Sequence, residues 1–219
     1  MEFKEQKREM IEQIKRHNID CAGYTHISTI SKQVLNAMMS VPRHDFVPES
    51  FIQSAYIDSP LSIGYGQTIS QPFIVALMCE ILKLKKTDRV LEIGAGSGYH
   101  AAVLSKLCLE VFTLEIVEEL AAIAAKNLSP YKNVKVLCKN GYNGWQEKSP
   151  FDAISVAAAA DSIPESLVDQ LAISGRMIIP LKNPDEPSQN LTLVKKQTNG
   201  ELYRNNILPV IFVPFVKNK

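Results

Sequence analysis

Residues 90–98 of the 219-residue chain read VLEIGAGSG, and this stretch decides the fold. Apolar residues typical of a buried strand lead into three closely spaced glycines, and an apolar helical pattern begins at Tyr99. Strand, glycine-rich turn and helix in this order predict the first unit of a parallel α/β sheet. The glycines let the backbone turn sharply and let a ligand approach it closely.

The spacing of these glycines distinguishes between ligands. A dinucleotide-binding loop reads G-x-G-x-x-G, whereas Gly94, Gly96 and Gly98 are spaced G-x-G-x-G. Glu92, just ahead of the loop, would repel a pyrophosphate but could hold an ammonium group directly or through water. Glu115 follows at about the 20-residue offset of an acid that binds ribose hydroxyls. The two acids together predict S-adenosylmethionine, and the alternative is that both are solvated strand-end residues.

The rest of the chain extends this pattern. Expected strands at 89–93, 111–114, 134–137, 153–156 and 176–179 alternate with expected helices at 99–106, 118–128 and 164–171. Strands at 191–196 and 208–215, joined through a turn at 198–200, should add an antiparallel edge. Residues 1–83 predict a helical extension, with helices at 4–16, after Ser31 and from Pro72, and with an ordered loop at 56–70. We therefore expect one compact domain, made of this extension and a core at 84–219.

Composition limits the classes of function. The formal net charge is +1 and 46% of the residues are hydrophobic, which favours a globular core and gives no global reason to expect nucleic acid or a membrane as partner. The N-terminus lacks the apolar stretch of a signal peptide. The four cysteines are scattered and predict buried free thiols in a cytoplasmic protein. The four histidines do not cluster with them at ligand spacing, so no metal site is expected.

Three features allow two interpretations each. Asn140, after the third expected strand, could contact an adenine amino group or could be a simple turn residue. Four alanines at 157–160 leave room either for a flat ring or for close helix packing. Ser70 could cap the helix that begins after Pro72, could contact a substrate, or could do both.

Several motifs in order resemble one family, the protein-L-isoaspartate O-methyltransferases. The resemblance begins near Val41. It is carried by VPRHDFVP at 41–48, YIDSPLSIGYGQTISQP at 56–72, VLEIGAGSGYHAA at 90–102, GYNGW at 141–145, and the segments at 157–163 and 170–180. The resemblance implies a Rossmann-like, S-adenosylmethionine-dependent methyltransferase fold with a mostly parallel, doubly wound sheet.

The resemblance also implies an activity. Members methylate the α-carboxylate of L-isoaspartyl residues in damaged proteins and peptides, which initiates repair through a succinimide, and they release S-adenosyl-L-homocysteine. We expect a monomer that needs no metal. Ser70 matches the active-site serine. The expected cofactor-binding residues are Gln67, Thr68, Ile69, Glu92, Gly94, Gly96, Ser97, Gly98, Glu115, Asn140 and Gly141, and the expected substrate-binding residues are Ile63, Gly64, Val213 and Pro214.

The chemistry itself predicts a modest role for Ser70. A carboxylate is ionised at neutral pH, so methyl transfer needs alignment and exclusion of water rather than a strong base. Ser70 is therefore expected to orient the carboxylate, not to act as a nucleophile. Asn140, Phe73 and His100 replace the residues usual in the family. Two alternatives stay open: a related carboxyl methyltransferase that acts on a dedicated peptide, and a non-catalytic protein that binds S-adenosylmethionine.

Overall fold

The computed structural model describes residues 3–217. Its α-helices are α1 (Lys4–Thr25), α2 (Lys32–Ser40), α3 (Pro72–Leu82), α4 (Tyr99–Ser105), α5 (Glu118–Asn127) and α6 (Glu165–Gln170). Its strands are β1 (Leu61–Gly64), β2 (Gln67–Ile69), β3 (Arg89–Ile93), β4 (Glu110–Glu115), β5 (Val134–Cys138), β6 (Phe151–Val156), β7 (Leu171–Lys182), β8 (Gln189–Lys196) and β9 (Leu202–Val210). Short 3-10 helices are η1 (Arg43–Phe46), η2 (Glu49–Ser54), η3 (Gly141–Asn143) and η4 (Gln146–Lys148).

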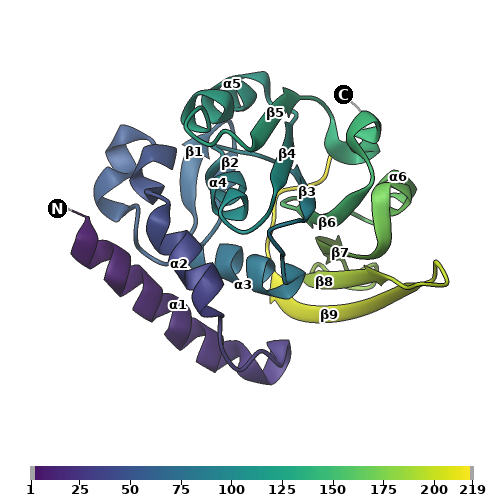
Figure 1. Cartoon of the computed structure of the whole chain (residues 1–219). Coiled ribbons are helices and arrows are strands. Elements are labelled where there is room, and N and C mark those ends of the chain that lie inside the picture. The colour runs from purple at the N-terminus through teal and green to yellow at the C-terminus, as the bar shows by residue number, and fades with distance from the viewer. Residues whose placement is uncertain (1–2, 218–219) are drawn as a thin grey trace.

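Seven strands form the central sheet in the order β5-β4-β3-β6-β7-β8-β9 (Figure 1). Strands β3 to β7 run parallel to one another, and β8 and β9 add an antiparallel edge next to β7. This confirms the predicted Rossmann-like sheet with its antiparallel C-terminal edge. The chain passes from β3 outward to β4 and β5, then returns to β6 on the other side of β3. The direction in which the chain adds strands to the sheet therefore reverses between β3 and β6. Such folds bind their ligands at this switch point.

The hydrophobic core is divided into two clusters, one on each face of the sheet, because alternate residues of each strand point to opposite faces. Val90 and Val111 belong to a cluster with the apolar faces of α1 to α5, whereas Leu91 and Ile93 belong to a second cluster with Leu167 of α6. Alternate side chains of one strand thus point to opposite faces of the sheet. Helix α1 runs along the outside of the molecule beside α2 and α3 (Figure 1).

The N-terminal helices confirm one predicted boundary and correct another. Ser31 caps α2, since its Oγ accepts a hydrogen bond from the Val34 N–H at 3.4 Å. The first helix was predicted to end near residue 16, but it runs to Thr25 and ends at His26 in the left-handed conformation. Its second half lacks an apolar stripe. It is tied down instead by polar contacts such as the buried Asn18, whose amide donates to the Ile27 carbonyl at 3.1 Å.

Two predicted segments were wrong. The segment at 56–70 was predicted as an ordered loop, but it contains strands β1 and β2, which pair as a hairpin around Tyr65 and Gly66, both with positive φ. The last strand was expected at 208–215, but β9 ends at Val210 and starts directly after the predicted turn. Its first half is polar and largely exposed, so the apolar pattern misplaced it. The residues that follow form a single bridge, Ala159 to Pro214, beside the end of β6.

The cysteines are free, and their burial differs from the prediction. Cys79 and Cys108 are buried and Cys21 is half-buried, but Cys138 is exposed. Cys138 is the last residue of β5, the strand at the edge of the sheet. Within residues 3–217, no helix is long and apolar enough to span a membrane.

Candidate functional site

The candidate site lies at the switch point of the strand order, beyond the carboxyl ends of β3 and β6. The glycine loop follows β3, and Ala157 follows β6 with its N–H donating to the Ile93 carbonyl at 2.8 Å. A Cβ built on Gly94 would lie 3.4 Å from the Ala157 Cβ. Ala157 and Ala158 line the cavity, whereas Ala159 and Ala160 are buried in the fold. The first half of the alanine run therefore faces the cavity, and the second half is buried and bridges to Pro214 and Leu181.

The backbone conformation of the loop requires glycine at three positions. Gly94, Gly96 and Gly98 all have positive φ, between 54° and 97°, a region that other residues rarely adopt. A Cβ on Gly98 would also lie 2.9 Å from side-chain carbons of Leu128. The loop thus needs glycine for conformation and for space, and it leads directly into the first turn of α4.

Glu115 fixes the loop from the neighbouring strand. Its carboxylate accepts hydrogen bonds from the Gly96 N–H at 2.8 Å, the Ile116 N–H at 2.9 Å and the Val117 N–H at 3.0 Å. A carboxylate offers about four acceptor positions, so about one remains for a ligand hydroxyl. Glu115 is 5% exposed and lines the cavity, as an acid that binds a ribose would.

Glu92 is fully buried behind the loop. It accepts a hydrogen bond from the Thr113 hydroxyl, its Oε1 has no hydrogen-bond partner, and the His100 Nδ1 lies 3.6 Å from that oxygen. Burial raises the pKa of Glu92 to about 8, partly opposed by the Thr113 hydrogen bond, and burial lowers the pKa of His100 to about 4. Glu92 does not itself line the cavity, but His100 does. A cation in the cavity would therefore favour the ionised form of Glu92 across His100.

The raised pKa of Glu92 predicts how stability depends on pH. Above its ordinary pKa of 4.5 the unfolded chain loses this proton, but the folded chain keeps it until about pH 8. Stability should therefore fall as pH rises through this window. Glu92→Gln removes the titration, so the variant should gain up to about 3 kcal/mol on the wild type between pH 5 and pH 8. Thermal unfolding of the ligand-free protein at several pH values measures this, and a pH-independent difference would contradict it.

Asn140 is a cap as well as a cavity residue. Its Oδ1 accepts a hydrogen bond from the Tyr142 N–H at 2.9 Å at the start of η3, and its amide donates to the Lys217 carbonyl at 3.2 Å. The turn interpretation is therefore observed. Gly141 follows it, and a Cβ there would lie 2.3 Å from the Ile93 Cγ2, so only glycine fits.

The hairpin brings Ser70 to the cavity, and Ser70 does not cap α3. The cap residue of α3 is Gln71, which makes no side-chain capping bond, so the capping interpretation of Ser70 was wrong. The first turn of α3 is held by Asp58, whose Oδ1 accepts from the Phe73 N–H at 2.8 Å and whose Oδ2 contacts His17. The Ser70 hydroxyl makes no hydrogen bond to another residue in the described part of the chain, which leaves it free for a ligand.

A cavity of about 1200 Å³ joins these parts. The predicted residues that line it are Gln67, Thr68, Ile69, Ser70, Gly94, Gly96, Ser97, Glu115, Asn140, Gly141, Val213 and Pro214. Four predicted residues do not: Glu92, Gly98, Ile63 and Gly64. Ile63 instead packs over the glycine loop, because its Cδ1 lies 3.2 Å from where a Gly96 Cβ would stand.

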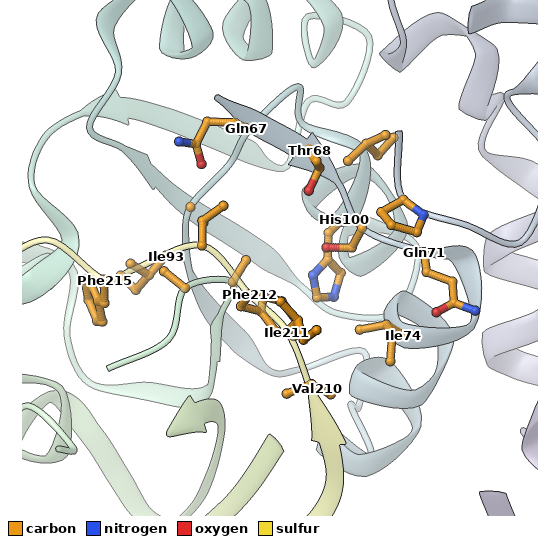
Figure 2. Close-up of a pocket in the computed structure, with 18 of the residues that line it drawn as sticks. Gln67, Thr68, Gln71, Ile74, Ile93, His100, Val210, Ile211, Phe212 and Phe215 are labelled. Atoms are coloured by element: carbon orange, nitrogen blue, oxygen red, sulfur yellow. The ribbon is translucent and has the colours of Figure 1, made fainter. Parts of the chain in front are cut away.

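Other parts of the wall were not predicted. Figure 2 shows the predicted Gln67 and Thr68 on one side of the cavity. The unpredicted residues around them are Gln71, Ile74, Val210, Ile211 and Phe212. His17 of α1 also lines the cavity. These residues belong to elements far apart in sequence, so only the fold reveals that they share one space. Residues 3–217 contain no group of three His, Cys, Asp or Glu side chains placed to hold a metal ion.

Comparison with known proteins places the chain. The model of the family described as protein-L-isoaspartate(D-aspartate) O-methyltransferase matches residues 5–219. Among curated relatives, a protein-L-isoaspartate O-methyltransferase of Opitutus terrae is 52% identical over 187 residues, which is 84% of this chain and 79% of the relative. A protein-L-isoaspartate O-methyltransferase 2 of Nitrosococcus oceani is 46% identical and covers 94% of each chain.

A solved structure agrees over the whole length. It is a Plasmodium falciparum protein described as a protein-L-isoaspartate O-methyltransferase in complex with S-adenosyl-L-homocysteine. It superposes with a TM-score of 0.80 at 32% identity, and the match covers 96% of this chain and 98% of that one. Sequence and fold therefore agree, and the chain belongs to the protein-L-isoaspartate(D-aspartate) O-methyltransferase family.

Proposed function

We propose that this protein transfers the methyl group of S-adenosylmethionine to the α-carboxylate of L-isoaspartyl residues in proteins and peptides, and so initiates their repair through a succinimide. Family membership supports the reaction. One observation carries its location: a single cavity is lined both by the glycine loop with Glu115 and by the hairpin residues from Gln67 to Ser70. The cofactor side and the acceptor side therefore face the same space.

The residues present fit S-adenosylmethionine. Gly94 and Gly96 line the cavity without side chains of their own, and Glu115 keeps about one acceptor position for a ribose hydroxyl. The unpartnered Oε1 of Glu92 lies behind His100, at the side where the amino-acid end would lie. We assign cofactor contacts to the loop, to Glu115, to the segment at 140–141 and to the residues at 67–69.

The chain's own part in the reaction is positioning. S-adenosylmethionine supplies an electrophilic methyl group, and the acceptor carboxylate needs no general base because it is already ionised. The free hydroxyl of Ser70 donates a hydrogen bond to one carboxylate oxygen and so orients the other. Apolar side chains, among them Ile74 and Phe212, line the cavity and exclude water from the reacting atoms. We assign substrate contacts to Ser70, Val213 and Pro214, which line the cavity.

We further propose that the protein works as a monomer in the cytoplasm. All four cysteines are free, which fits a reducing compartment. The proposed site is built from one chain, so a second copy need not contribute to it. Size-exclusion chromatography with light scattering would measure the mass in solution, and a stable dimer would contradict the monomer.

A matched pair of peptides tests the reaction. With labelled S-adenosylmethionine, a peptide with one isoaspartyl residue should accept methyl groups, whereas its aspartyl twin should accept at least about 100-fold fewer, because the shifted backbone misplaces its carboxylate. Scintillation counting of the separated peptides measures both rates. Equal labelling would favour a broader carboxyl methyltransferase. Cofactor binding with no labelling of either peptide would favour the non-catalytic alternative.

A further inference from the structure

Arg43 carries a guanidinium group buried directly behind Ser70. The side chain is 0% exposed. Its Nε donates to the Ala55 carbonyl at 2.8 Å and its Nη2 donates to the Ser70 carbonyl at 2.9 Å, so it joins the two ends of the segment that contains the hairpin. Its Cζ lies 4.7 Å from the centre of the Tyr99 ring.

This buried charge has no ion-pair partner in the described part of the chain. No carboxylate there lies within 4.0 Å of the guanidinium, and the buried Nη1 has no hydrogen-bond partner. Asp58 is close enough to act on Arg43 electrostatically, but its two oxygens are engaged by the Phe73 N–H and by His17. Arginine keeps its proton even in protein interiors. Among the described residues, the interior therefore holds a cation that no carboxylate contacts directly.

Holding the hairpin in place does not require a positive charge. An unpaired buried charge is costly, and an apolar side chain of similar volume is often better tolerated at such a position. A neutral amide could donate to the same carbonyls. The charge is therefore the feature to be explained, and an anion that is bound only during the reaction would explain it.

We propose that Arg43 is a positioning residue whose buried charge, placed behind Ser70, is the electrostatic complement of the acceptor carboxylate. This inference rests on the proposed function, which brings an anionic acceptor to Ser70. The guanidinium does not reach the carboxylate. It acts through the Ser70 peptide group that it holds and through the protein interior, where charges are screened less than in water.

The inference makes a specific kinetic distinction. Methyl transfer converts the carboxylate into a neutral ester, so the attraction to Arg43 is strongest in the bound substrate and weaker in the transition state and product. The charge should therefore lower KM for the peptide without raising kcat, and it should favour release of the ester. Replacing a residue that only supports the fold would not raise KM selectively while leaving kcat unchanged.

The test compares two ligands that differ in one charge. Binding of an isoaspartyl peptide, and of its twin with an α-carboxamide in place of the α-carboxylate, is measured by calorimetry on protein saturated with S-adenosylhomocysteine. The wild type should prefer the carboxylate. Arg43→Met and Arg43→Gln should lower this preference about tenfold and raise KM while kcat changes little, whereas Arg43→Lys should keep most of the preference.

Arg176 provides the matched control. It is a half-buried arginine that donates to the Lys83 carbonyl at 3.2 Å, away from the cavity lining. Arg176→Met should leave the preference for the carboxylate unchanged. Unfolding temperature and S-adenosylhomocysteine affinity of every variant are measured in parallel, and if Arg43→Met does not fold, the comparison of Arg43→Gln with Arg43→Lys decides.

Two results would overturn the inference and are distinguishable. If the wild type prefers the carboxylate and Arg43→Gln keeps that preference, Arg43 only holds the hairpin, and the proposed function is unaffected. If the wild type itself shows no preference and transfers no methyl group to the isoaspartyl peptide, the proposed function fails and the inference fails with it.

Discussion

Ser70→Ala is expected to lower kcat about 100-fold while the affinity for S-adenosylhomocysteine stays within about twofold. The magnitude is that of removing one preorganised hydrogen-bond donor that orients a reacting oxygen. The backbone should stay in place, because Arg43 holds the Ser70 carbonyl rather than its hydroxyl. Steady-state kinetics with an isoaspartyl peptide, together with calorimetry of cofactor binding, measures both quantities.

Ser62 is the matched control for this variant. It lies on the exposed side of the same hairpin, and in the described residues its hydroxyl contacts only the Gly64 N–H, at 3.4 Å. Ser62→Ala should leave kcat nearly unchanged. A Ser70→Ala variant that binds the cofactor weakly but turns over normally at saturation would show that Ser70 belongs to the cofactor site instead.

Glu115→Ala should weaken S-adenosylhomocysteine binding by about 100-fold. The substitution leaves the Gly96, Ile116 and Val117 N–H groups without their acceptor and removes the oxygen offered to the ribose. An unsatisfied buried donor costs about 1–3 kcal/mol, and a 100-fold loss of affinity corresponds to about 2.7 kcal/mol. Calorimetric titration measures the affinity, and the unfolding temperature of the free protein shows how much of the effect is structural.

Glu119→Ala is the control for Glu115→Ala. Glu119 is an exposed acid in the first turn of α5, four residues further along the chain. The Glu119→Ala variant should bind S-adenosylhomocysteine with the affinity of the wild type. If Glu115→Ala were destabilised yet bound S-adenosylhomocysteine normally, Glu115 would be a support of the loop only.

The core of the site was predictable because its signals are local. Gly94, Gly96 and Gly98 must bend one turn of chain, and Glu115 ends the very next strand, so spacing alone specifies their geometry. The parallel sheet was predictable for the same reason, since each strand and helix carries its own periodic pattern. The structure adds that Glu115 binds the loop itself through the Gly96 N–H.

The missed features depend on contacts between distant segments. No local pattern indicates that Asp58 caps α3, or that Arg43 is buried against the Ser70 carbonyl. The hairpin was missed because its strands are short and only alternate residues are buried. The second half of α1 and the first half of β9 were misjudged because polar side chains there make tertiary contacts or lie exposed.

Asn140, the least certain part of the cofactor site from sequence, has a structural explanation. Its amide donates a hydrogen bond to the Lys217 carbonyl, which a carboxylate in its place could not do. Its Oδ1 still caps η3, as a carboxylate would. Asparagine therefore keeps the turn and ties down the end of the C-terminal segment, so this substitution does not by itself support a non-catalytic protein.

The most direct test is the position of the methyl group within one peptide. The substrate contains one isoaspartyl residue, one aspartyl residue and a free C-terminus, and tandem mass spectrometry after a single round of transfer locates the added mass. We expect it on the isoaspartyl α-carboxylate alone. Methyl groups shared among the three carboxylates, or placed on the aspartyl side chain, would contradict the assignment of this cavity to isoaspartyl methylation.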